Sequence, residues 1–228
     1  MDEYWKHLYD SLSKSPDTSL LEQVGKTLNG APLPEEQLTL IVDSAVEALN
    51  LSKQDLFVDL CCGNGIITER IAPLVRRAWG IDQSAGLIAA AQRHSNAENV
   101  EYIVAEAIHV DPHLFSGLRK YLINESIQHF TTEYLDNVLH AMSRLESGSM
   151  IYLSGIPDLE KIKLYYDTPA KIAFYESRER EGKPHSGKWW LRSDIEQIAR
   201  NRGFRTRIVP QKYEMVTHYY RFDILLDK

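Results

Sequence analysis

The chain has 228 residues, of which 43% are hydrophobic and 25% charged, and its net charge is −6. This composition is typical of one soluble globular domain, and no run approaches the ~18 apolar residues of a membrane-spanning helix. The N-terminus is polar and acidic, unlike a secretory signal, and the adjacent Cys61 and Cys62 lack metal-ligand spacing. We therefore expect a cytoplasmic protein with no metal site and no membrane partner.

Charge is distributed unevenly along the chain. Residues 1–160 carry 11 basic and 23 acidic side chains, whereas residues 161–228 carry 15 and 9. The acidic character of residues 1–160 argues against a nucleic-acid partner, because a protein that binds nucleic acid needs a basic surface. The basic tail is either a solvated surface or a surface that faces an anionic substrate. The sequence does not indicate an oligomeric state.

Residues 1–50 are expected to form a helical arm. Apolar residues at helical spacing predict a short amphipathic helix over residues 4–12. A second helix is expected to begin at Pro34, with two acidic residues in its first turn and an apolar stripe that continues to residue 49.

From residue 56 apolar strands alternate with amphipathic helices. The expected strands are residues 56–60, 78–81, 100–104, 121–123 and 150–153, and the expected helices are residues 66–74, 87–93 and 133–145. Such βαβα order predicts a parallel sheet with helices on both faces. We assign residues 56–155 to this core.

Residues 192–228 depart from the alternation. Residues 193–196 read as a capping box that opens a helix ending at Gly203. Residues 204–209 and 220–226 follow as two strands with no helix between them, which predicts an antiparallel hairpin at the sheet edge. The whole chain is thus expected to be one α/β domain with a Rossmann-like, doubly wound, seven-stranded sheet that is mostly parallel.

A glycine turn follows the first core strand and reads Asp59-x-Cys61-x-Gly63-x-Gly65. Thr68 stands where the G-x-G-x-x-G fingerprint of dinucleotide-binding proteins has its third glycine, which lets helix and strand pack closely. The absence of this third glycine argues against an NAD or FAD site. The turn resembles the first motif of the class I S-adenosylmethionine-dependent methyltransferases, written acid-x-G-x-G-x-G, with Cys61 in place of the first glycine.

The resemblance covers about residues 20–155 and implies an S-adenosylmethionine site, with S-adenosylhomocysteine as product. Asp82 ends the second strand, where the family's acid accepts hydrogen bonds from both ribose hydroxyls; alternatively it caps the next helix. Glu106 stands where the family usually has an aspartate near the adenine and is one methylene longer. Lys26 either pairs with the cofactor carboxylate or is solvated. The remaining cofactor positions that the resemblance implies are Asn64, Gln83, Ala107 and Asn124.

A proton acceptor is expected where an alcohol is the methyl acceptor. His129 follows the fourth strand directly, at the edge where ligands of open α/β sheets bind, and small-molecule O-methyltransferases of this family often have a histidine there. The alternative is that His129 packs against the cofactor. His218, in the loop between the last two strands, is a rival base, and an acceptor that needs no histidine is the third possibility.

Residues 158–191 are too long for an ordinary connection, and we expect them to cover the substrate. The candidate acceptor residues are Tyr166, Arg178, Lys188, Trp189 and His218. Trp189 and its neighbour either wall a pocket or pin the insert to the core. Arg221 and Asp223 share one face of the last strand, as an internal ion pair or as substrate ligands.

The predicted function is transfer of a methyl group to an oxygen or nitrogen of a small-molecule acceptor. An anionic acceptor would be compatible with the basic residues 161–228. Residues 187–190 and 220–223 resemble methyltransferases of bacterial surface-polysaccharide biosynthesis, which implies a sugar, a nucleotide-sugar or a phosphorylated precursor. The competing predictions are an NAD(P)-dependent Rossmann oxidoreductase and a non-catalytic S-adenosylmethionine-binding protein.

Overall fold

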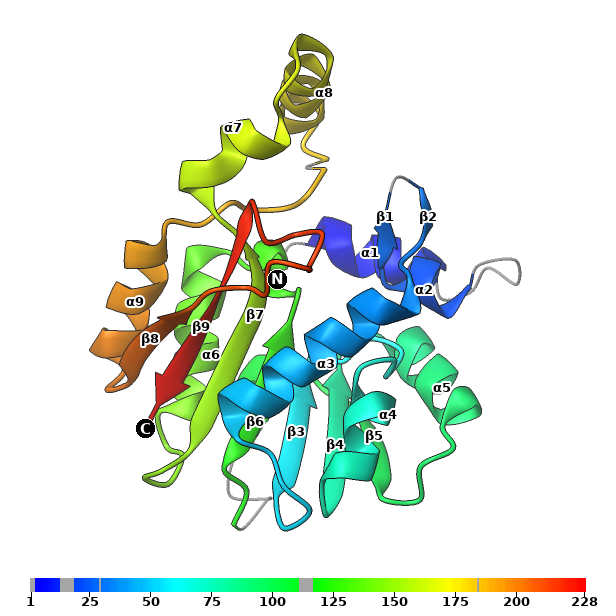
Figure 1. Ribbon diagram of the computed structural model, residues 1–228, viewed down its shortest axis with the longest axis vertical. Coiled ribbons are helices and arrows are strands. Elements are labelled where there is room, and N and C mark those ends of the chain that lie inside the picture. The colour runs from blue at the N-terminus through cyan, green and yellow to red at the C-terminus, as the bar shows by residue number, and fades with distance from the viewer. Residues whose placement is uncertain (1–2, 13–18, 29, 111–116, 184) are drawn as a thin grey trace.

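The computed structural model describes residues 3–12, 19–28, 30–110, 117–183 and 185–228. Its centre is a seven-stranded sheet with the strand order β5-β4-β3-β6-β7-β9-β8 (Figure 1). The strands of this sheet are β3 (Leu56–Leu60), β4 (Arg77–Asp82), β5 (Val100–Val104), β6 (Lys120–Asn124), β7 (Met150–Pro157), β8 (Arg205–Val209) and β9 (Arg221–Asp227). Two short strands, β1 (Thr27–Leu28) and β2 (Ala31–Pro32), form a separate hairpin.

The strand directions confirm the expected fold class. Strands β5, β4, β3, β6 and β7 pair in parallel, and β9 is antiparallel to both β7 and β8. The last strand therefore lies inside the sheet, and β8, not the whole hairpin, forms the edge. Because β8 points the same way as the parallel strands, the loop of residues 210–220 leaves at the edge where those strands end.

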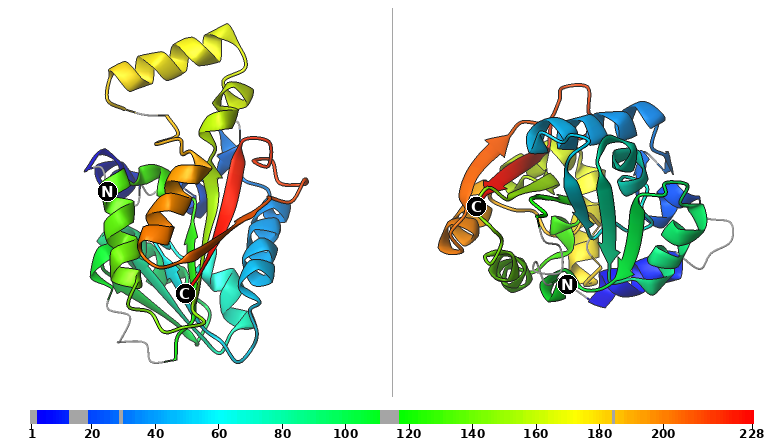
Figure 2. Two further views of the ribbon diagram at one scale, coloured as in Figure 1. Left: turned by 90° about the vertical axis from the view of Figure 1, so that its left-hand side faces the viewer. Right: turned by 90° about the horizontal axis from the view of Figure 1, so that it is seen from below.

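Helices cover both faces of the sheet (Figure 2). One face carries α3 (Glu35–Leu49), α4 (Thr68–Ile71) and α5 (Ala85–His94), and the other carries α6 (Thr132–Met142) and α9 (Arg192–Asn201). Successive strand residues point to opposite faces, so Phe57 packs in the cluster beneath α3 and Val58 in the cluster beneath α6. Both clusters are buried, which explains why the core strands read as continuous apolar runs.

Two helix boundaries differ from expectation. The helix expected over residues 66–74 is only α4 followed by a 3-10 turn (Ala72–Leu74), since Pro73 cannot continue an α-helical hydrogen-bond ladder. The expected capping box at residues 193–196 was wrong. Helix α9 begins at Arg192, its N-cap is Leu191, and no side chain caps it.

Residues 158–191 rise above the carboxyl edge of the sheet as a 3-10 turn (Leu159–Lys161), α7 (Ile162–Tyr165) and α8 (Pro169–Arg180) (Figures 1 and 2). No side chain of α8 is buried. The N-terminal helices α1 (Glu3–Leu12) and α2 (Leu20–Gln23) lie at the same edge (Figure 1). Within the described ranges, none of the helices is long and apolar enough to cross a bilayer.

An ion pair between a buried carboxylate and a partly exposed guanidinium fixes both ends of the insert. Asp158 is fully buried at the end of β7, and its Oδ2 accepts hydrogen bonds from Nε and Nη2 of Arg192 at 3.0 and 2.6 Å. Leu159 N also donates to Trp190 O at 2.9 Å, so the segment that enters the insert and the segment that leaves it lie side by side. A buried carboxylate requires such a partner because desolvation of a lone charge is costly.

Substitution Arg192→Met should therefore lower the free energy of unfolding by about 3–5 kcal/mol, because it leaves the Asp158 carboxylate buried and unpaired. Urea unfolding at pH 7 measures the change. Arg200→Met is the matched control, since Arg200 pairs with Glu196 on the surface and should cost at most about 0.5 kcal/mol. Equal, small losses in both variants would contradict a structural role for the buried pair.

Candidate functional site

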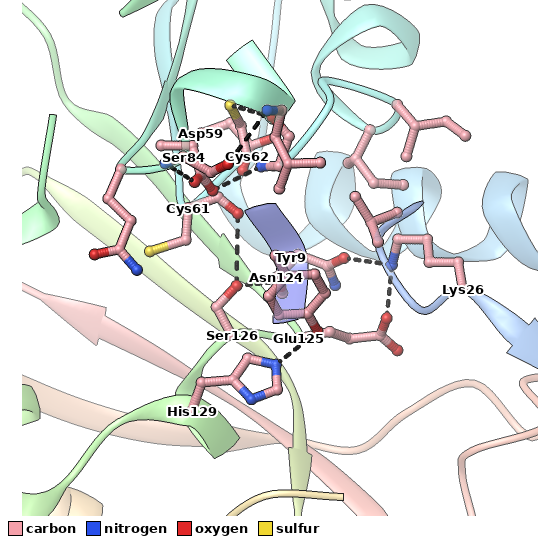
Figure 3. Close-up of a pocket in the computed structure, with 17 residues that line it drawn as sticks. Tyr9, Lys26, Asp59, Cys61, Cys62, Ser84, Asn124, Glu125, Ser126 and His129 are labelled. Atoms are coloured by element: carbon pink, nitrogen blue, oxygen red, sulfur yellow. Dashed lines mark hydrogen bonds and ion pairs between the residues drawn. The ribbon is translucent and has the colours of Figure 1, made fainter. Parts of the chain in front are cut away.

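A cavity of about 710 Å³ lies at the carboxyl ends of β3, β4 and β6 and is bounded by the N-terminal arm (Figure 3). This first cavity is at the edge where open α/β sheets bind their ligands. Its lining residues are Tyr9, Val24, Lys26, Asp59, Cys61, Cys62, Gly63, Ile66, Ile67, Asp82, Gln83, Ser84, Leu87, Asn124, Glu125, Ser126 and His129.

The glycine turn after β3 follows a left-handed path. Cys61, Gly63 and Gly65 have φ of 61°, 58° and 76°, so the cysteine adopts the conformation for which the family's first glycine is suited. The Asp59 carboxylate anchors the turn from below by accepting a hydrogen bond from Thr68 Oγ1 at 2.7 Å. Burial raises the pKa of Asp59 to about 7, although the bond from Thr68 lowers it.

The glycines of the turn make room for protein atoms. A Cβ on Gly65 would overlap the Tyr102 hydroxyl, and a Cβ on Gly63 would lie 2.8 Å from Cγ1 of Val24 in the arm. Gly65 is not among the residues that line the first cavity. Gly65 therefore leaves room for Tyr102, and of these two glycines Gly63 is the one that lines the cavity.

Asp82 links the turn to the next helix. Its Oδ2 accepts a hydrogen bond from Gly63 N at 2.9 Å, and its Oδ1 accepts one from Ser84 N at 2.8 Å. The cap of α5 is Ser84, whose Oγ accepts from Leu87 N, so Asp82 is not itself the cap. Burial raises the pKa of Asp82, whereas these backbone hydrogen bonds act in the opposite direction and lower it. Each carboxylate oxygen retains acceptor capacity for a ligand at the cavity.

Three charged residues from distant segments meet at the end of β6. Lys26 Nζ lies 2.6 Å from Glu125 Oε2, and Arg221 Nη1 lies 3.3 Å from Glu125 Oε1. Lys26 Nζ also donates to Asn124 Oδ1 at 3.0 Å (Figure 3). Burial alone raises the pKa of Glu125, but Lys26 and Arg221 outweigh it and hold the pKa at about 2. Glu125 is therefore an anion at neutral pH.

Glu125 was missed as a site residue, although it directly follows Asn124 at a strand end. Its φ is 49°, an uncommon value for a residue with a side chain. A Cβ on Gly155 would lie 2.5 Å from Cγ of Glu125, so that glycine leaves room for the carboxylate. The expected Arg221–Asp223 ion pair was wrong: Asp223 accepts from Gly155 N at 2.7 Å and from Gln211 Nε2 at 2.9 Å instead.

The N-terminal arm is attached to the glycine turn and to the first cavity. Asn64 Nδ2 donates to Leu20 O at 2.7 Å and to Gln23 Oε1 at 3.2 Å. Asn64 is thus placed to hold α2, and it does not line the first cavity. Lys26, which follows α2 in the arm, lines the cavity but is already paired with Glu125.

His129 lies in a short 3-10 turn after β6 and is covered by α1. Its ring centroid is 4.2 Å from that of Trp5, and its Nε2 is 3.1 Å from the Tyr9 hydroxyl. Nδ1 is buried and has no hydrogen-bond partner among the described residues. Burial, reinforced by the charge of Arg221, lowers the pKa of His129 to about 3. The imidazole is therefore neutral throughout the physiological range.

The sequence-predicted cofactor residues divide into two groups. The first cavity brings together Lys26, Asp59, Cys61, Gly63, Asp82, Gln83, Asn124 and His129. Asn64, Gly65, Glu106 and Ala107 are not among its lining residues. Ala107 is buried in the cluster beneath α6, and Glu106 directly precedes it at the start of a 3-10 turn.

A second cavity, of about 1050 Å³, adjoins the first and lies among the arm, the insert and the loop of residues 210–220. Lys26 and Glu125 line both cavities, and Arg221 lines the second. Of the residues predicted to contact the acceptor, Tyr166 lines this cavity. The two cavities therefore meet at the charged cluster.

The other predicted acceptor residues do not line the second cavity. Arg178 donates to the Tyr4 hydroxyl at 3.2 Å, and Lys188 Nζ lies 3.7 Å from the Trp190 ring centroid. Trp189 is buried beside Tyr166 and pins the insert rather than walling a pocket. His218 Nδ1 lies 2.7 Å from Met215 O.

Comparisons with known proteins agree with this geometry. A family model described as a methyltransferase domain matches residues 57–146, which include the glycine turn, Asp82 and Glu125. Among curated proteins none matches the sequence. The fold is shared with the complex of the Haloferax volcanii Trm112 methyltransferase activator and a methyltransferase (12% identity, 96% of both chains, TM-score 0.68).

Two further solved structures have the same fold at similarly low identity. One is magnesium protoporphyrin IX methyltransferase from Synechocystis with bound S-adenosylhomocysteine, at 15% identity, 99% and 93% coverage and a TM-score of 0.61. The other is geranyl diphosphate C-methyltransferase from Streptomyces coelicolor, at 14% identity, 95% and 87% coverage and a TM-score of 0.60. These likenesses concern the fold.

The contact between Gly65 and Tyr102 gives a direct test of the turn. Gly65→Ala should destabilise the protein by about 2–4 kcal/mol, since it adds overlap with a buried ring to the strain of a positive φ. Gly117→Ala is the matched control, because Gly117 has a φ of +80° and no atom of the described residues lies within 4 Å of its Cβ position. Thermal unfolding measures both. If the two losses are equal, backbone strain alone explains the glycine.

Proposed function

We propose that this chain is a class I S-adenosylmethionine-dependent methyltransferase that moves a methyl group to an oxygen or nitrogen of a small-molecule acceptor in the second cavity. The observation that carries this proposal is that the two cavities meet at Lys26 and Glu125. A donor in one cavity and an acceptor in the other would then be adjacent, and methyl transfer depends mainly on such alignment.

The residues of the first cavity fit the cofactor. Asp82 offers a carboxylate to ribose hydroxyls, and Asn124 and Lys26 offer polar groups to the amino-acid end. The cofactor, when bound, supplies an activated methyl group on a sulfonium.

His129 is the proposed proton acceptor for an alcohol. It lines the first cavity and is unprotonated at physiological pH, but its pKa of about 3 makes it a weak base in this state, so the role requires that its pKa rise when the acceptor is bound. Its Nε2 already contacts the Tyr9 hydroxyl, and a proton would pass through that contact or after Tyr9 moves aside. His218 is the weaker candidate because it lines neither cavity.

The narrower identity of the acceptor stays a proposal. A sugar, nucleotide-sugar or phosphorylated precursor is expected from the resemblance of the C-terminal residues, and the cytoplasm is the expected compartment. The methyltransferase domain match over residues 57–146 favours this reaction over hydride transfer with NAD(P). A non-catalytic cofactor-binding protein remains the alternative that a turnover assay decides.

Asp82 provides the test of the cofactor site. Asp82→Ala should weaken S-adenosylhomocysteine binding by about 10–150-fold, equivalent to the roughly 1.5–3 kcal/mol of hydrogen bonds to a charged acceptor. Asp82→Asn keeps one acceptor oxygen and should lose less. Calorimetric titration of the folded variants measures both. Unchanged affinity in Asp82→Ala, or tight binding of NAD by the native chain, would contradict the assignment.

His129 provides the test of the proton acceptor. His129→Ala should bind the cofactor within about threefold of the native affinity yet transfer methyl groups ~10²–10⁴-fold more slowly to an alcohol. The rate is measured with labelled methyl groups on an acceptor found by screening sugars, nucleotide-sugars and aromatic acids. Retained turnover in His129→Ala and loss in His218→Ala would move the role to the loop. Retained turnover in both would indicate an acceptor without need of a histidine.

The low pKa of His129 also predicts a pH dependence of stability. Between about pH 6.5 and 3 this histidine takes up a proton on the unfolded chain but not in the folded protein. Its contribution to folding is thus complete above pH 6.5 and is lost as the pH falls below that value. The loss between pH 7 and 5 should be about 2 kcal/mol smaller in His129→Gln, as urea unfolding would show. An identical loss in the native protein would contradict the lowered pKa.

A further inference from the structure

The second cavity is rich in aromatic rings. Those that line it are Tyr165, Tyr166, Phe174, Tyr219 and Tyr220. They come from the insert and from the loop before β9, and they pack on one another: the ring centroids of Tyr165 and Tyr220 are 4.6 Å apart. Tyr166 and Tyr220 are buried, whereas Phe174 and Tyr219 remain 48% and 39% exposed. Exposed rings at a cavity offer flat faces on which a planar ligand can stack.

The charge of the same lining is positive. Its charged members are Lys26, Lys171, Arg221 and Glu125, which makes three cations and one anion. Burial and the charge of Arg178 lower the pKa of His185, which also lines the cavity, so this ring adds no charge at neutral pH. Glu125 is already shared between Lys26 and Arg221.

Two of the cations retain capacity for a ligand. Arg221 donates from Nη1 to Gly155 O at 2.6 Å, but its buried Nε has no partner among the described residues. Lys171 pairs with Asp167 at 2.8 Å, and both side chains of that pair are about half exposed, so the pair is weak and exchangeable. An arginine with unsatisfied donors is well suited to a carboxylate or a phosphate.

We propose that the second cavity takes a planar aromatic acceptor that carries an anionic group, with the ring among the tyrosines and the anion at Arg221 and Lys171. This inference rests on the proposed methyltransferase function and narrows its acceptor class. The anion comes from an aromatic carboxylate or from a nucleotide phosphate, which share this chemistry.

The positive charge of the cavity lining argues against a cationic amine as the acceptor. Clustered aromatic rings also bind cationic amines through their negative faces. A cationic amine here would meet Arg221 and Lys171 as like charges, while the one acid, Glu125, is already paired with Lys26. A neutral sugar would offer Arg221 Nε at most an uncharged acceptor, and it would leave the positive charge of the lining uncompensated.

Ligands that differ in one feature separate the contribution of the aromatic ring to binding from that of the negative charge. Calorimetric titrations in saturating S-adenosylhomocysteine would compare 4-hydroxybenzoate with 4-hydroxybenzamide, which lacks the charge, and with 4-hydroxycyclohexanecarboxylate, which lacks the aromatic ring. Tyramine tests a cation, and uridine monophosphate against uridine tests the phosphate source. We expect at least one aromatic anion to bind ten or more times more tightly than its neutral, non-aromatic and cationic counterparts.

A variant and its control locate the anion. Lys171→Met should weaken binding of that anion about five- to tenfold and leave its neutral counterpart unchanged. Lys163→Met is the matched control, since Lys163 is an exposed lysine of the insert that does not line the cavity, and it should have no effect. Equal losses in both variants would show a general effect of surface charge and overturn the proposed position.

The remaining outcomes are distinguishable. If S-adenosylhomocysteine binds but no aromatic anion does, or if a neutral or cationic analogue binds as well, the acceptor class is wrong and the methyltransferase function stands. If S-adenosylhomocysteine itself does not bind the native chain, the proposed function fails, and the acceptor class fails with it.

Discussion

The pairing of Glu125 with Lys26 and Arg221 is the interaction on which the rest of the site depends. It joins the segment after α2 in the N-terminal arm to the end of β6 and the start of β9, and it lies where the two cavities meet. Three charges with little access to water are tolerable only together, since each alone would carry the full penalty of desolvation. The chain accommodates them with a left-handed residue at 125 and a glycine at 155.

Much of the fold was predictable from local pattern. Strands β3 and β5 were predicted to the residue, and the ends of the other core strands to within four residues, because apolar runs bounded by turn residues are local signals. Asp82 and the glycine turn were also predictable, since a short motif carries them. The α9 boundary was missed because it depends on Arg192 meeting Asp158, which lies in a distant part of the chain.

The missed parts of the site are those made by long-range contact. Lys26 and Glu125 are 99 residues apart in sequence, so no window of sequence contains the pair. Arg221 and Asp223 looked like partners because they share a strand face, yet each has partners from elsewhere. Trp189 was expected to wall the acceptor pocket or to pin the insert, and burial beside Tyr166 and Tyr220 selects the second role. Composition alone could not decide between them.

Cys61 shows what a glycine motif encodes. The backbone there has a φ of 61°, as a glycine would allow at no cost, but the residue carries a side chain. For an ordinary residue that conformation costs on the order of 1–2 kcal/mol, which the surrounding fold must offset. The motif therefore describes a set of backbone dihedral angles, which a residue other than glycine adopts here. A search for proteins with this turn by backbone conformation would find members that a search for the glycine pattern misses.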